Sequence, residues 1–83
     1  MNPEDIREIL LEIFKKYSKA SQEYLLSNKP LMEVMDSLTL IEIIFQIEEN
    51  FKIKVEDEEI ARLKCFEDVV NGISLKLSQD AAN

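Results

Sequence analysis

Residues 34–51 read VMDSLTLIEIIFQIEENF, and this stretch decides the fold class that the sequence predicts. On a helical wheel at about 100° per residue, residues 38–51 form two apolar stripes. The first has the i, i+3, i+4, i+7 spacing of a face that packs on a core, and it consists of Leu40, Ile43, Ile44, Ile47 and Phe51. The second is centred roughly 140° away by the same arithmetic, and it consists of Leu38, Ile41 and Phe45. The stretch therefore predicts an amphipathic helix from about 36 to 50 with a second apolar face.

The second stripe has two interpretations. A small bundle cannot easily bury two faces of one helix, so we expect Leu38, Ile41 and Phe45 to be at least partly exposed. Polar side chains border this stripe, and apolar groups rimmed by polar ones indicate an interaction surface; the polar residues are Thr39, Glu42, Gln46, Glu49 and Asn50. The alternative is that the preceding loop folds over Leu38 and Ile41.

Toward the N-terminus, the sequence predicts one more helix followed by a long loop. Asn2 can cap the helix, Pro3 suits its first position, and acidic residues follow in the first turn. Helical spacing then continues through Ile6, Ile9, Leu10, Ile13 and Tyr17. Residues 18–35 lose this periodicity, so we expect a loop there, which a short turn around residues 23–26 would interrupt.

Toward the C-terminus, the sequence predicts a brief extended stretch over 51–55, a helix of one or two turns beginning near Asp57, and a last helix. The apolar positions of this last helix are Phe66, Val69, Val70, Ile73 and Leu77. Gly72 lies inside it at a cost of roughly 1 kcal/mol relative to alanine, which indicates either a close approach or simple tolerance. The predicted fold is all-α, a small four-helix bundle of three longer helices and one short helix, with the long loop between the first two. We expect a single domain over 1–77 and a frayed tail over 78–83.

Composition narrows the classes of function. The chain has 83 residues, with 17 acidic residues against 10 basic ones, for a formal net charge of −7. This charge disfavours nucleic acid and anionic lipid surfaces as partners and favours proteins with basic patches. There is no histidine, which removes the commonest general base and metal ligand. No apolar run is long enough for membrane insertion. The single cysteine cannot form an intramolecular disulfide. We expect a cytoplasmic monomer.

Ser37 is the candidate modified residue, because it lies in the first turn of the predicted helix, where free N–H groups and the helix dipole favour an attached or bound anion. A purely structural role would be N-capping. Asp36 is at least as good a cap, and a cap at Ser37 would place Leu40 at the third helical position, so that no capping box forms. As a nucleophile Ser37 would lack a histidine base, so hydrolase chemistry is not expected.

Two other groups of residues predict no site. Asp57, Glu58 and Glu59 lack the alternating ligands and the glycine of a calcium-binding loop, so complementarity to the helix dipole explains them better, and no metal site is assigned. Cys65, directly before Phe66, is interpreted as a small buried apolar residue rather than a reactive thiol.

The order of several motifs resembles that of acyl carrier proteins. Asp36-Ser37-Leu38 opens an apolar and acidic helix, and the matching positions that follow are Ile41-Glu42, Glu48-Glu49, Phe51 and residues 55–59. The resemblance covers most of the chain, through the Phe66-Val70-Ile73 stripe. It implies that a phosphopantetheinyl transferase attaches 4'-phosphopantetheine to Ser37, between Asp36 and Leu38. It also implies a carrier that holds acyl groups as thioesters for enzymes of fatty acid or specialised lipid or polyketide biosynthesis, and that is not itself an enzyme.

The same resemblance implies a recognition face for those enzymes. Its residues are Asp36, Leu38, Ile41, Glu42, Phe45, Glu48 and Glu49. Two positions depart from the family pattern: Val34 stands where glycine is common, and Thr39 stands where an acid is common, which favours a specialised carrier as much as a housekeeping one. Two alternatives remain open, an aminoacyl or peptidyl carrier and an unmodified acidic helical adaptor that docks a partner helix on the second stripe.

Overall fold

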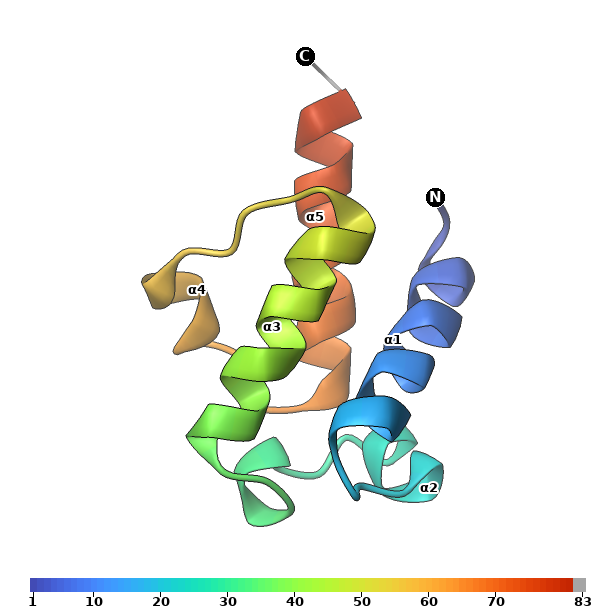
Figure 1. Cartoon of the computed structure of the whole chain (residues 1–83). Helices are drawn as coiled ribbons and strands as arrows, with labels where there is room; N and C mark the ends of the chain where they lie inside the picture. Colours follow the sequence, from blue (N-terminus) through green and yellow to red (C-terminus); the bar gives the residue numbers. More distant parts are fainter. Residues whose placement is uncertain (82–83) are drawn as a thin grey trace.

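The computed structural model describes residues 1–81 and contains three long helices and several short ones (Figure 1). In chain order the elements are α1 (Pro3–Tyr17), α2 (Gln22–Leu26), the 3₁₀ helix η1 (Leu31–Glu33), α3 (Ser37–Phe51), α4 (Asp57–Ile60) and α5 (Phe66–Ala81). The predicted all-α bundle is confirmed. The expected loop over 18–35 is interrupted by α2, which lies where the sequence allowed a short turn around residues 23–26, and also by η1. Helix α5 continues past the predicted domain end at residue 77; the frayed tail stays a prediction, and residues 82–83 lie outside the described part.

Helix α1 is the element against which α3 and α5 both pack. The Asp5 backbone N–H donates to the Asn2 side chain at 2.9 Å, so the predicted cap forms. At the other end the Ser18 hydroxyl donates to the Phe14 carbonyl at 2.7 Å. The Phe14 ring meets the Phe66 ring edge-on, with centroids 5.5 Å apart and an interplanar angle of 81°. Both rings are fully buried, so this pair joins α1 to the start of α5 in the centre of the core.

Helix α3 buries the first apolar stripe, as the wheel predicts. Its buried residues are Leu40, Ile43, Ile44, Ile47 and Phe51. Phe51 belongs to the last turn of α3 and not to an extended stretch. The helix ends because Lys52 adopts the left-handed conformation, with φ 56° and ψ 46°. The chain then turns toward α4.

The segment between α1 and α3 packs along the lower part of the bundle as drawn in Figure 1. The Ser21 hydroxyl caps α2 by accepting from the Tyr24 N–H at 3.0 Å, and Leu25 is buried. Leu31 is also buried, and its N–H donates to the Lys64 carbonyl at 2.9 Å. The segment is therefore anchored toward the start of α5, which leaves the second stripe of α3 uncovered.

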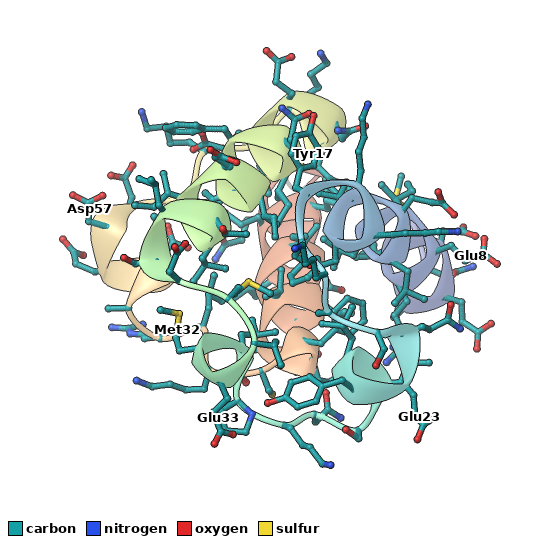
Figure 2. All side chains as sticks on the ribbon, turned by 60° about the horizontal axis from the view of Figure 1, so that its bottom comes forward. Glu8, Tyr17, Glu23, Met32, Glu33 and Asp57 are labelled. Carbon is teal, nitrogen blue, oxygen red and sulfur yellow. The ribbon has the colours of Figure 1, made fainter. Side chains whose placement is uncertain are left out.

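The start of α1 and the end of α5 lie away from the start of α3 (Figure 1). Figure 1 shows the start of α1 and the end of α5 toward one end of the bundle, and the start of α3 toward the other. Acidic side chains are spread around the surface: Figure 2 shows Glu8, Glu23, Glu33 and Asp57 pointing outward on different sides. Over residues 1–81, no helix is both long enough and apolar enough to cross a membrane.

Candidate functional site

Ser37 is the first residue of α3, and its side chain is exposed. The capping role falls to Asp36, whose carboxylate accepts a hydrogen bond from the Thr39 backbone N–H at 2.8 Å. This bond lowers the pKa of the Asp36 carboxyl below its ordinary value of 3.8. Within residues 1–81 the Ser37 hydroxyl makes no hydrogen bond. Capping therefore accounts for Asp36 and leaves Ser37 free for chemistry.

The approach to Ser37 is held in place by the core. Leu31 of η1 is fully buried, and its carbonyl accepts hydrogen bonds from the Val34 and Met35 N–H groups at 3.0 and 3.2 Å. Val34 and Met35 are half-buried. On the other side, the Leu40 N–H donates to the Asp36 carbonyl at 3.1 Å, which starts the helical ladder. Ser37 thus lies at a helix end that a buried leucine anchors on each side.

The second stripe of α3 is open to solvent next to this serine. Leu38 is 68% exposed, Ile41 38% and Phe45 59%, whereas Leu40 on the opposite stripe is only 5% exposed. This contrast confirms the assignment of the two stripes, and the alternative in which the loop folds over Leu38 and Ile41 is wrong. An apolar face of this kind, starting beside Ser37, is available to a partner.

The acidic residues predicted for the recognition face separate into two groups. Glu42 and Glu49 are exposed on α3. Glu48 is half-buried, and its carboxylate accepts a hydrogen bond from the Val55 N–H at 2.9 Å. Glu48 therefore closes the connection between α3 and α4 rather than standing free, and the basic Lys54 is exposed beside this connection.

Comparison with known proteins identifies the family. The family model for the phosphopantetheine attachment site matches residues 4–73. The chain belongs to the acyl carrier protein family. It is 32% identical over 71 residues to the acyl carrier protein of Campylobacter concisus (strain 13826), a match that spans 84% of this chain and 88% of that one. It is 40% identical over 45 residues to the acyl carrier protein of Petrotoga mobilis (strain DSM 10674 / SJ95), across 54% of this chain and 53% of that one.

The family match confirms the predicted cofactor, covalently bound 4'-phosphopantetheine. The residues at the start of α3 fit such a group. An exposed hydroxyl without a hydrogen-bond partner is accessible to a transferase, and the N-terminal end of a 15-residue helix favours a phosphodiester through its dipole. The Asp36 carboxylate at the same helix end is held by the Thr39 N–H. The relatives are carriers of cargo rather than enzymes.

The carrier domain contains a small apolar cavity of ≈ 30 Å³ between α3, α4 and α5. Its walls are formed mainly by Ile44, Ile47, Ile53, Val55, Leu63, Val69, Gly72 and Ile73. Glu59 and Lys76 are the polar residues of the lining, and their side chains form an ion pair at 2.7 Å. The Lys76 side chain is the main cause that lowers the pKa of Glu59 below 4.5, followed by the Glu56 N–H. Sequence reasoning missed this pair, because nothing in the spacing links Glu59 to Lys76.

The remaining candidates take structural roles in the carrier domain. Glu59 also completes a capping box with Glu56 at the start of α4. In the described part of the chain, no three acidic or cysteine side chains come together as a metal site would require. Cys65 is half-buried rather than buried, and its N–H donates to the Asp68 carboxylate at 3.2 Å.

Proposed function

We propose that Ser37 carries the phosphopantetheine arm, and that the protein uses it to deliver acyl groups to enzymes of fatty acid or specialised lipid or polyketide biosynthesis. One observation supports this residue above all: Ser37 is exposed and without a hydrogen bond at the first position of α3, while its neighbour Asp36 does the capping. A serine needed only for helix capping would be bonded as Asp36 is.

The arm supplies a terminal thiol that holds an acyl group as a thioester. The residues of the chain present and protect the attachment point. Asp36 fixes the first turn through the Thr39 N–H, so that the Ser37 hydroxyl projects from a defined position. The free N–H groups of that turn and the positive end of the α3 dipole stabilise the negative charge that attachment brings.

The recognition face is the second part of the proposal. Leu38, Ile41 and Phe45 offer apolar contact to a phosphopantetheinyl transferase and to the enzymes that follow it. Glu42 and Glu49, both exposed on the same helix, pair with basic groups on these partners and speed the encounter. Glu48 contributes less directly, because its carboxylate is already bonded to the Val55 N–H. We infer a cytoplasmic monomer for this role.

The apolar cavity supports an acyl cargo over an aminoacyl one. Its lining is aliphatic apart from the Glu59–Lys76 pair at its edge, and polar aminoacyl groups would lose hydrogen bonds to water there without replacing them. An unmodified adaptor domain would use the stripe of Leu38, Ile41 and Phe45 without any chemistry at Ser37. Modification by a phosphopantetheinyl transferase distinguishes the adaptor from the carrier.

The test is modification of the purified protein by coenzyme A, magnesium and a broad-specificity phosphopantetheinyl transferase, followed by intact-mass measurement. We expect a gain of one phosphopantetheine in the parent and none in Ser37→Ala. Ser78→Ala, an exposed helical serine in α5, is the matched control and should load as the parent does. Failure of the folded parent to gain mass, or loading of Ser37→Ala, would overturn the proposal. Exclusive acceptance of aminoacyl groups in a subsequent ligase assay would replace the acyl cargo by an aminoacyl one.

A further inference from the structure

Gly72 has no conformational reason to be glycine. It lies inside α5, where glycine costs about 1 kcal/mol relative to alanine, and no glycine of the described residues has a positive φ. A Cβ built on Gly72 would meet no atom within 4 Å. The close approach that the sequence left open is therefore absent. An alanine would fit here without displacing any neighbour, and Gly72 is half-buried.

The empty space at Gly72 belongs to the apolar cavity. Gly72 shares one face of α5 with Val69, Ile73 and Lys76, and all four line the cavity opposite α3 and α4. Protein interiors are normally packed to the density of organic crystals. A cavity of ≈ 30 Å³ next to a helical glycine is a place where packing has been left incomplete. A single methyl group would take up much of it.

A surface groove lies next to this cavity and includes part of the recognition face. The groove, ≈ 380 Å³ in volume, lies between α3 and α4 and includes Ile41 and Phe45 of the exposed stripe. Ile44 and Val55 line both the groove and the cavity. These two side chains therefore separate the groove from the cavity, and an apolar chain that lies on Ile41 and Phe45 would enter the cavity by displacing them.

Among the helices around the cavity, α4 is the one that can move outward to admit a longer acyl chain. It has only four residues, none of them buried, and it is flanked by non-helical residues 53–56 and 63–65. Its charged contact with α5 is the Glu59–Lys76 pair. The aromatic pair Phe14–Phe66 at the centre of the core lies on other elements. Moving α4 outward thus disturbs less packing than moving α1, α3 or α5.

We propose that Gly72 sets the length of acyl chain that this carrier admits between α3, α4 and α5. The missing side chain leaves the path along α5 open, so that the end of an alkyl chain lies against the Gly72 backbone. A methyl group at this position shortens the path. This inference rests on the proposed function, because the chain arrives on the arm at Ser37.

The test uses the holo protein loaded with straight saturated acyl chains from butyryl to tetradecanoyl. The readout is the rise in Tm on acylation, plotted against chain length. We expect the rise to grow with length in the parent, to stop growing at a shorter chain in Gly72→Ala, and to be lost for all but the shortest chains in Gly72→Leu.

The alanine variant excludes misfolding as an explanation. A Cβ at Gly72 meets nothing, and alanine favours the helix, so unacylated Gly72→Ala should melt no lower than the parent. Asn71→Ala, at the neighbouring exposed position of α5, is the matched control and should keep the chain-length profile of the parent.

The outcomes separate this inference from the proposed function. Equal profiles for the parent, Gly72→Ala and Asn71→Ala would overturn the role of Gly72 while leaving the carrier function intact. The same holds if acylation of the parent raises Tm equally at every length. A parent that takes no phosphopantetheine at all would overturn the proposed function and this inference with it.

Discussion

Alanine substitution of Leu38 and Leu40, one at a time, tests which face of α3 belongs to the core. The two leucines lie two residues apart on one helix, with exposures of 68% and 5%. Each substitution removes three carbons, worth roughly 2.4 kcal/mol of transfer free energy if fully buried. Leu40→Ala should lower the free energy of unfolding by about 3 kcal/mol, because it loses nearly all of this transfer free energy and also leaves a cavity. Leu38 is about one-third buried, so its loss should stay below about 1 kcal/mol.

The assay is urea unfolding followed by circular dichroism. A domain of this length has a free energy of unfolding of roughly 4 to 12 kcal/mol, so Leu40→Ala removes a large share of it. If Leu40→Ala does not fold, Ile43→Val against Ile41→Val repeats the comparison, with losses of about 1 kcal/mol and a few tenths. In transferase assays the order reverses: folded Leu40→Ala should load like the parent, and Leu38→Ala more slowly. Equal losses of stability for Leu38→Ala and Leu40→Ala would refute the assignment of the two faces.

Two further predictions concern charge. Asp36 and Glu59 have pKa values lowered from 3.8 and 4.5, by the Thr39 N–H and by Lys76 respectively. Because each folded-state pKa lies below the unfolded one, the stabilisation is complete above about pH 5 and is lost as pH falls through the folded-state values. We would measure Tm from neutral pH to about pH 3. Tm should fall less over this range in Asp36→Asn, which keeps a capping side chain, than in Glu8→Gln, the surface control. Equal slopes of Tm against pH in the two variants would contradict this prediction. The second prediction follows from the net charge of −7, because repulsion among the acidic side chains destabilises the fold and salt screens it. Added NaCl or MgCl₂ should therefore raise Tm. A Tm that stays constant or falls with salt concentration would contradict this.

The long helices were predictable because each repeats its burial pattern over several turns. The cap at Asn2 and the stripe from Leu40 to Phe51 are local signals, and both are confirmed. Helix α2 has only five residues and buries one of them, Leu25, so the sequence indicated no more than a short turn around residues 23–26. The end of α3 also lacked a signal, since Lys52 takes the left-handed conformation that glycine or asparagine usually occupies.

In the candidate site, too, the features that depend on a single helix were predictable, and those that depend on two elements were not. Exposure of Leu38 and burial of Leu40 follow from the wheel, because both depend on one helix alone. Glu48 lies on α3, but the Val55 N–H that it binds reaches it only after the chain has turned beyond Lys52. The Glu59–Lys76 pair and the space at Gly72 likewise depend on how α4 packs against α5. The residue spacing within either helix does not predict that packing.

The positions of the start of α1 and the end of α5 have a consequence for attachment. The start of α1 and the end of α5 lie toward one end of the bundle, and Ser37 begins α3 toward the other (Figure 1). A linker fused to either end, or a solid support coupled there, would leave the serine pointing outward. The tethered domain would then swing as a whole, and the effective concentration of its cargo at a partner would depend on the length of the linker as well as on the arm.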